Sequence, residues 1–195
     1  MIFLAGPHGA GKTTVAEMLS EYDFEYLDLG GILRRKHKAE AEDINFELWC
    51  QQKEKIFGPT FTDDIIVEEV KKHKERILSQ LNSVQDLIIV GSRSFRGLKY
   101  IINKVGLFKN KKNVIIYIDA PISVLQRHYC LKEHKKISLK RFKELLGKDE
   151  KMGISTIIPY ADIKILNDGS KKDLRAKVEE IFFSKLGYSR QSSTL

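Results

Sequence analysis

An anion-binding loop lies near the start of the chain. Residues 6–13 read GPHGAGKT and fit the pattern G-x-x-x-x-G-K-[ST], in which successive backbone N–H groups point at phosphate oxygens. In this pattern Lys12 reaches the outer phosphates of a nucleotide, and the hydroxyl of Thr13 is placed to ligate Mg²⁺. The sequence therefore predicts a P-loop, whose phosphate-binding residues are Gly9, Ala10, Gly11, Lys12, Thr13 and Thr14.

The elements around this loop have the order that the motif requires. The apolar run at residues 2–5 reads as a buried strand, and apolar residues have helical spacing over residues 12–21. Continuous apolar runs of strand length follow at residues 87–90 and 114–118, and strands are also predicted at residues 24–27 and 161–166. Buried runs separated by helices are typical of parallel sheets. The sequence therefore predicts an α/β fold of three layers with a five-stranded parallel sheet.

Capping residues and turns predict where the other helices begin and end. A basic helix is expected from Arg34, after two glycines, and another over residues 46–56. Thr62, followed by two acids, predicts the start of a long helix that runs toward Leu81. Ser170 predicts the start of a final helix to about residue 186, and residues 189–195 are expected to form a flexible tail. Trp49 could stack on a ligand base or pack in the core, and the core is favoured.

Polar and charged residues follow the ends of the predicted strands. Ligands of open α/β sheets bind outside the carboxyl ends of the strands, so these residues are candidates for one shared site. Besides the P-loop residues they are Asp28, Arg34, Ser92, Arg93, Asp119, Arg127, Gly169 and Ser170.

The composition is that of a globular protein that attracts anions. The chain has 195 residues, 42% of them hydrophobic and 31% charged, with a formal net charge of +8. Residues 128–151 hold eight Lys or Arg against four Asp or Glu, and they form either a solvated helix face or a lid over phosphates. No apolar run approaches the roughly 20 residues that span a bilayer, and no leader precedes the first strand. We therefore expect a cytoplasmic protein without membrane association, in which the two distant cysteines are reduced.

With these motifs in place, the chain resembles the adenylate kinase-like nucleoside monophosphate kinases. The family's G-D-x-L-R motif is matched by residues 30–34 except at Gly31, and its D-G-x-R-S motif by residues 90–94 except at Val90. The chain is most similar to the branch named dephospho-CoA kinase-like or adenylate kinase-like, through KDEK at residues 148–151 and GISTIIPYAD at residues 153–162. The resemblance implies one kinase domain over residues 1–188, with an acceptor-binding segment at about 30–82 and a lid at about 128–151.

The resemblance also implies an activity and a set of site residues. The activity is transfer of the γ-phosphoryl group of ATP to a nucleoside monophosphate, with Mg²⁺ as the cofactor. Bidentate arginines suit the acceptor phosphate better than lysines do. The implied residues are Lys12, Arg93 and Arg127 for catalysis, Arg34 and Arg93 for the acceptor, Arg141 in the lid, and Gly169 and Ser170 beside the adenine of ATP.

Two departures from the family's pattern bear on the metal. The acid that the family has in place of Val90 holds Mg²⁺ through water, and Gly31 also replaces an acid. Asp28 and Asp119 are the strand-end carboxylates that could take over beside Thr13.

Several functions stay open at this point. The acceptor could be a nucleoside monophosphate or dephospho-CoA, and the missing acids also allow a weakly active ATP-binding regulator. A nucleic-acid-linked ATPase ranks last, because the basic segment has no interleaved aromatic residues for stacking. The expected partners are therefore small nucleotides, and the oligomeric state is left open.

Overall fold

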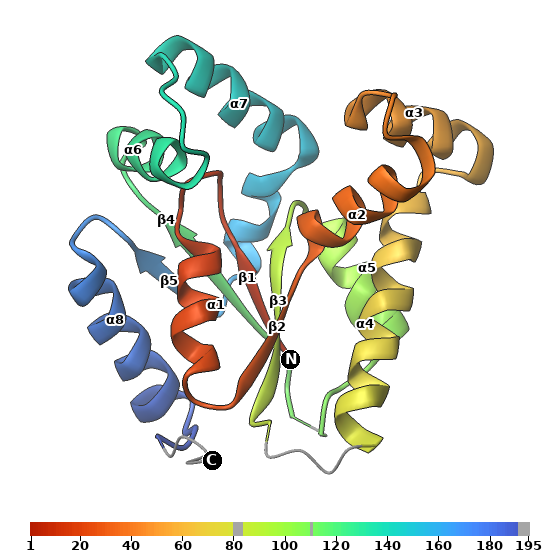
Figure 1. Ribbon diagram of the computed structural model, residues 1–195. Helices are drawn as coiled ribbons and strands as arrows, with labels where there is room; N and C mark the ends of the chain where they lie inside the picture. Colours follow the sequence, from red (N-terminus) through yellow and green to blue (C-terminus); the bar gives the residue numbers. More distant parts are fainter. Residues whose placement is uncertain (80–83, 110, 191–195) are drawn as a thin grey trace.

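Five parallel strands form a sheet in the computed structural model, which describes residues 1–79, 84–109 and 111–190 (Figure 1). The sheet has the order β2-β3-β1-β4-β5 and confirms the predicted five parallel strands. Because β1 lies at its centre, the P-loop leaves from the middle of the carboxyl edge. The strands are β1 (Ile2–Ala5), β2 (Phe24–Asp28), β3 (Asp86–Ser92), β4 (Val114–Asp119) and β5 (Ile163–Leu166).

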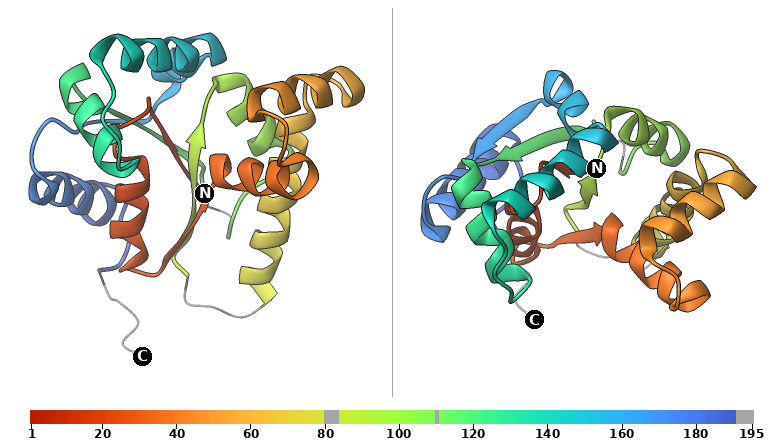
Figure 2. Two further views of the ribbon diagram at one scale, coloured as in Figure 1. Left: turned by 45° about the horizontal axis from the view of Figure 1, so that its top comes forward. Right: turned by 90° about the horizontal axis from the view of Figure 1, so that it is seen from above.

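Helices cover both faces of the sheet, because side chains alternate along each strand. In β1, Phe3 and Ala5 pack against one layer, whereas Ile2 and Leu4 pack against the other. The first layer contains α2 (Leu29–Ala41), α4 (Phe61–Ser79), α5 (Phe95–Val105) and the 3₁₀ segment η1 (Ile154–Tyr160). The second contains α1 (Lys12–Ser20), α6 (Ile122–Lys132), α7 (Leu139–Met152), α8 (Lys171–Glu179) and the π-helical segment η2 (Glu180–Lys185). The predicted three-layer fold is thus confirmed (Figure 2).

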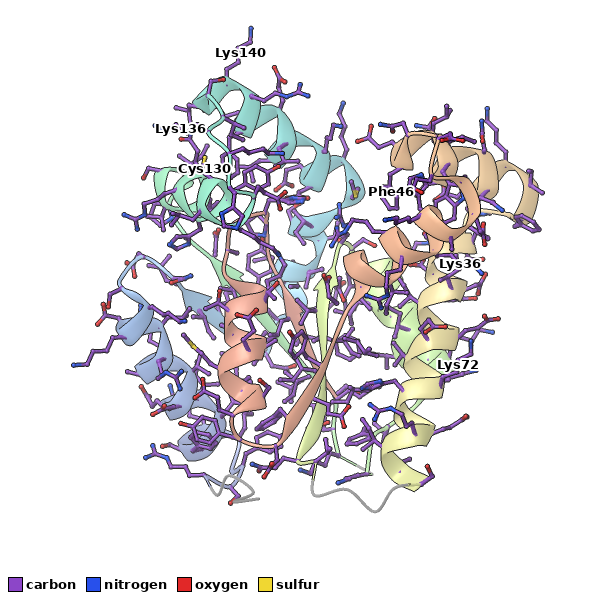
Figure 3. All side chains as sticks on the ribbon, in the orientation of Figure 1. Lys36, Phe46, Lys72, Cys130, Lys136 and Lys140 are labelled. Carbon is purple, nitrogen blue, oxygen red and sulfur yellow. The ribbon has the colours of Figure 1, made fainter. Side chains whose placement is uncertain are left out.

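Two helical arms flank the carboxyl edge of the sheet (Figure 1). In one arm, α3 (Phe46–Phe57) connects α2 with α4, and Trp49 is 1% exposed among the rings of His37, Phe46 and Phe61. Trp49 therefore belongs to a core, as the sequence favoured. The other arm consists of α6 and α7, and Figure 3 shows its Lys136 and Lys140 pointing outward. Over the described ranges, no helix is both long and apolar enough to cross a membrane.

The basic helix α2 begins five residues earlier than predicted, at Leu29 rather than Arg34. Asp28 caps it, because its Oδ1 accepts a hydrogen bond of 3.0 Å from the backbone N–H of Gly30. The two glycines therefore lie in the first turn instead of breaking the chain. This cap fixes the Asp28 carboxylate at the end of β2.

Other boundaries also differ from the prediction. Thr62 does not cap α4, because the helix already begins at Phe61, and the predicted end at residue 81 lies outside the described residues. Ser170 caps α8 as predicted and forms a capping box with Asp173. Ser189 exchanges two hydrogen bonds with Gln85, so it does not belong to a free tail, and residues 191–195 lie outside the described ranges.

Candidate active site

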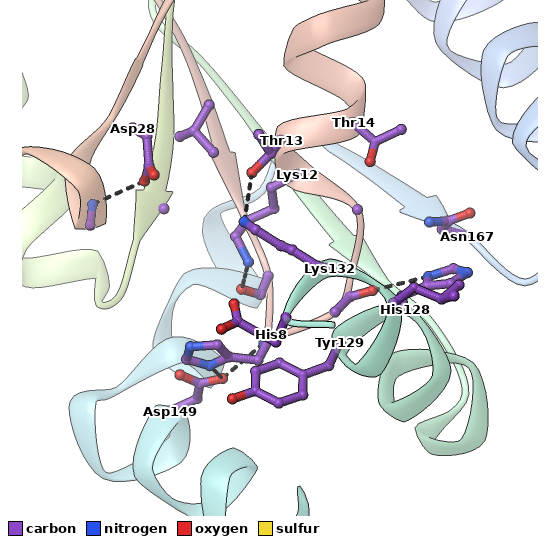
Figure 4. A pocket seen from close by; sticks show the side chains of 18 of the residues that line it. His8, Lys12, Thr13, Thr14, Asp28, His128, Tyr129, Lys132, Asp149 and Asn167 are labelled. Atoms are coloured by element: carbon purple, nitrogen blue, oxygen red, sulfur yellow. Dashed lines mark hydrogen bonds and ion pairs between the residues drawn. The ribbon is translucent and has the colours of Figure 1, made fainter. Parts of the chain in front are cut away.

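A cavity of about 670 Å³ lies at the carboxyl edge of the sheet. Its wall is formed by the P-loop, by the residues that follow β2 and β3, by α6 and by the last turn of α7 (Figure 4). The predicted site residues that line it are Gly9, Gly11, Lys12, Thr13, Thr14, Asp28, Arg34, Ser92, Arg93 and Gly169. Those that do not line it are Ala10, Asp119, Arg127, Arg141 and Ser170.

The P-loop is packed against β4 and α6 so closely that two positions require glycine. Gly9 has a φ of +81°, and a Cβ there would lie 2.1 Å from the carbonyl oxygen of Leu125 in α6. Gly6 has a φ of +142°, and its Cβ would lie 2.0 Å from the carbonyl oxygen of Ile118 in β4. Other residues rarely adopt such angles, and no Cβ fits at these distances. Backbone packing therefore sets the shape of the loop.

Lys12 folds back over this loop. Its Nζ donates hydrogen bonds to the carbonyl oxygens of Gly6 at 2.7 Å and Pro7 at 2.8 Å (Figure 4). Burial lowers the pKa of Lys12 to about 8, and the nearby negative charge of Asp149 opposes this effect only in part. A buried ammonium group is stabilised by an anionic partner, so phosphate oxygens would bind favourably here.

One face of α6 meets the P-loop. His128 donates a hydrogen bond from Nδ1 to the carbonyl oxygen of Gly9 at 3.1 Å, and Nζ of Lys132 lies 3.4 Å from Oγ1 of Thr13. These two residues are four apart and so share a helix face. Arg127 lies on a different face and is exposed, which is why it does not reach the cavity.

The predicted lid residue Arg141 is also placed away from the cavity. Its Nη1 donates to Oε2 of Glu144 at 2.8 Å, within the exposed face of α7. Within the basic segment at residues 128–151, Lys132 instead lies next to the P-loop, and it has no special signal in a segment rich in lysine.

Both predicted acceptor arginines line the cavity, and each has an acidic neighbour. Nη2 of Arg34 lies 3.3 Å from Oδ2 of Asp28, and Nη1 of Arg93 lies 3.9 Å from Oδ1 of Asp149. Ser92 also lines the cavity, and its buried Oγ has no hydrogen-bond partner. The two arginines can therefore bind an anionic group in this cavity.

Asp149 is a site residue that the sequence pattern did not single out. It is 5% exposed, and its Oδ2 accepts hydrogen bonds from the backbone N–H and ring Nδ1 of His8. Burial alone would raise the pKa of Asp149, but the bonds from His8 and the charge of Arg93 outweigh this and hold it below its usual range. Its one sequence signal was its place in KDEK, a segment noted for resemblance alone.

The turn after β5 supports the P-loop from behind. Nδ2 of the buried Asn167 donates to the carbonyl oxygen of Ala10 at 3.0 Å. Gly169 lines the cavity, whereas the hydroxyl of Ser170 is engaged in capping α8. This turn therefore offers backbone at the cavity wall rather than the Ser170 side chain.

The residues present fit a magnesium ion beside the P-loop. Thr13 supplies a hydroxyl, and Asp28 lines the same cavity from a position paired in register with Val90. Asp119 does not fit, because it is exposed and its Oδ1 accepts a hydrogen bond from Ala120 N–H at 2.8 Å. The described residues contain no cluster of three or more His, Cys, Asp or Glu that could hold a metal. A magnesium ion here would thus need nucleotide phosphates among its ligands.

The chain has distant relatives of nearly equal length. No family model matches it. The UPF0200 proteins of Saccharolobus islandicus and Saccharolobus solfataricus are each 24% identical over 187 residues, which covers 93% of this chain and 91% of the relative. A UPF0200 protein of Thermococcus gammatolerans is also 24% identical over 187 residues, with 93% of both chains covered.

The fold of the chain is similar to that of several solved structures. Shikimate kinase from Acinetobacter baumannii, in complex with shikimate, aligns with a TM-score of 0.58 at 21% identity and covers 94% of this chain and 93% of its own. Shikimate kinase from Aquifex aeolicus aligns with a TM-score of 0.50 at 19% identity and covers 95% and 96%. Together with the sheet order and the P-loop, these likenesses show that the chain has a P-loop kinase-like fold.

Proposed function

We propose that this protein is an ATP-dependent kinase that transfers the γ-phosphoryl group to a small acceptor, with a nucleoside monophosphate as the first candidate. The proposal is carried by a single cavity that is lined by the P-loop and by both Arg34 and Arg93. Its volume of about 670 Å³ suits small-molecule substrates. In this proposal residues 30–82 bind the acceptor and residues 128–151 form the lid of one domain over residues 1–188.

The donor half consists of the P-loop and its neighbours. Lys12 would exchange its bonds to loop carbonyls for bonds to ATP phosphates, and the loop amides would hold the β-phosphate. Thr13 and Asp28 are the residues that would hold Mg²⁺, Asp28 through water. When bound, Mg²⁺ neutralises charge on the β- and γ-phosphate oxygens.

The acceptor half needs little more than positioned cations, because phosphoryl transfer depends on alignment and charge neutralisation. Arg34 and Arg93 can each present a planar fork to an anionic acceptor group. We assign to Lys132 the role that the family resemblance gave to Arg127, since Lys132 reaches Thr13 and Arg127 is exposed outside the cavity.

A dephospho-CoA kinase-like activity is the second candidate. Its acceptor is a hydroxyl, which must lose a proton, and the carboxylate of Asp28 lines the cavity where it could accept one. A weakly active ATP-binding regulator is the third, because Val90 provides no acid at the end of β3.

The test is ADP formation by the purified protein with ATP, Mg²⁺ and, in separate reactions, nucleoside monophosphates and dephospho-CoA. Acceptor-dependent ADP supports a kinase and identifies its acceptor. Arg93→Ala should lower turnover by about tenfold or more, since charged hydrogen bonds contribute roughly 1.5–3 kcal/mol. Arg96→Ala is the matched control, because Arg96 is exposed and lies outside this cavity. ATP binding without acceptor-dependent turnover would favour the regulator, and stimulation by RNA or DNA alone would favour a nucleic-acid-linked ATPase.

A further inference from the structure

The carboxylate of Asp149 connects three parts of the site that are far apart in the sequence. Its Oδ2 accepts hydrogen bonds from the backbone N–H of His8 at 2.9 Å and from Nδ1–H of the same residue at 2.7 Å (Figure 4). Its Oδ1 lies 3.9 Å from Nη1 of Arg93. The last turn of α7 is thereby connected to the P-loop and to the residue after β3.

The surroundings keep both partners of Asp149 in place. The ring of His8 lies edge-on to Tyr129 of α6, with 6.1 Å between ring centroids. Nη1 of Arg93 also lies 3.1 Å from the sulfur of Met152, again in the last turn of α7. Neither His8 nor Arg93 can turn away without losing contacts to this helix.

Burial makes the charge of Asp149 significant. A carboxylate that is 5% exposed is costly unless hydrogen bonds and cations meet it. Here the two bonds from His8 reach Oδ2 and the guanidinium of Arg93 lies near Oδ1. The neighbouring carboxylate in the same helix, Glu150, is exposed to solvent and therefore serves as a comparison.

We propose that Asp149 is a positioning residue for phosphoryl transfer, which holds His8 of the P-loop and Arg93 in a fixed mutual arrangement. The inference rests on the proposed kinase function, in which the P-loop binds the donor and Arg93 meets the acceptor. One anion then sets the distance between the two halves of the site, and transfer depends on that alignment. Asp149 acts through its two partners, so its loss should affect the aligned state more than nucleotide binding.

The first test is hydrogen–deuterium exchange of the full chain without nucleotide. Asp149→Asn keeps the size of the side chain but removes the charge opposite Arg93. We expect several-fold faster exchange in residues 6–13 and 139–152, and wild-type exchange in the control Glu150→Gln. His8→Ala, which removes the ring bond and the contact with Tyr129 but keeps the backbone bond, should also speed exchange in residues 139–152. Unchanged exchange in both test variants would overturn the connection.

The second test compares two affinities in the presence of Mg²⁺: that for ADP alone, and that for ADP with aluminium fluoride and AMP. Aluminium fluoride beside ADP imitates the phosphoryl group in transfer. Asp149→Asn should weaken the aluminium fluoride complex by about tenfold and leave ADP binding within about twofold of wild type. Equal losses of both affinities would indicate a merely structural role and contradict the proposal.

A failure of the kinase function can be told apart from a failure of this inference. If the wild type has no preference for the aluminium fluoride complex, transfer to AMP is contradicted, and the exchange measurement alone decides on the connection. If the wild type has the preference and Asp149→Asn keeps it, the positioning role is wrong and the kinase function stands. In the double variant with His8→Ala, the combined loss should be smaller than the product of the two single losses, because the two side chains contact each other. Additive losses would contradict that shared contact.

Discussion

Replacing Gly9 by alanine tests whether the P-loop and α6 form one rigid unit. The new Cβ would lie 2.1 Å from the carbonyl oxygen and 2.8 Å from the carbonyl carbon of Leu125, whereas ordinary contact begins at 3.4 Å. Because these are backbone atoms, no side chain can rotate to make room. Either α6 moves by more than 1 Å or the loop leaves its position, and in both cases the bond from His128 to the Gly9 carbonyl is disturbed.

The expected cost of Gly9→Ala has two parts. An alanine at a φ of +81° costs about 1–2 kcal/mol, and overpacking typically costs about 1–3 kcal/mol. The free energy of unfolding should therefore fall by about 2–5 kcal/mol. Displacement of the loop should also weaken ADP binding by at least about tenfold, because in this motif the backbone N–H groups bind phosphate oxygens.

Gly187→Ala is the control for the backbone angle alone. Gly187 has a φ of +72°, and nothing lies within 4 Å of a Cβ built there. Its substitution should cost only about 1–2 kcal/mol and leave ADP binding unchanged. The assays are urea unfolding and fluorescence titration with labelled ADP. If Gly9→Ala costs no more than Gly187→Ala and binds ADP normally, the packing of the loop on α6 does not shape the site.

Three further predictions concern charged residues of the site. Lys132→Ala should lower acceptor-dependent turnover, measured as initial rates, by about tenfold. Arg127→Ala should leave the initial rates unchanged, because of these two residues only Lys132 reaches the P-loop. Asp28→Asn should raise the Mg²⁺ concentration that gives half-maximal rate, while urea unfolding changes by less than about 0.5 kcal/mol, because asparagine caps a helix as well as aspartate does. Burial raises the pKa of Asp149, but its bonds from His8 outweigh this, so the folded pKa lies below the unfolded one. The extra stability of wild type over Asp149→Asn should thus be complete at pH 7 and shrink as the pH falls below about 4. If the difference in free energy of unfolding between wild type and Asp149→Asn is the same at pH 7 as below about pH 4, the pKa of Asp149 is not lowered by folding.

The sheet and the P-loop could be predicted because their signals are local. The apolar runs that became β3 and β4 are continuous, and the pattern from Gly6 to Thr13 specifies its own backbone. The start of α2 was missed because two glycines read as a break, whereas the cap from Asp28 places them in a helix.

The residues that line the cavity were harder to predict, because their positions depend on the rotation of helices and on contacts between distant parts of the sequence. Arg127 and Lys132 both lie on α6, and only the packing of that helix decides that Lys132 faces the P-loop. Asp28 and Asp119 both end strands, but only Asp28 lines the cavity. This difference depends on the pairing of Asp28 with Val90 in the sheet and on the hydrogen bond that Asp119 accepts from Ala120. Asp149 meets His8 across 141 residues of sequence, a separation that no local pattern reports.

In the proposed function, one cavity holds both substrates of a phosphoryl transfer. The most direct measurement follows ATP labelled in its γ-phosphate, incubated with Mg²⁺ and each candidate acceptor, in wild type and in Arg93→Ala. The label should pass to one acceptor in the wild type, and Arg93→Ala should reduce this transfer by about tenfold or more while ATP affinity stays within about twofold. Label that reaches only water, or transfer that is unaffected by loss of Arg93, would contradict the account.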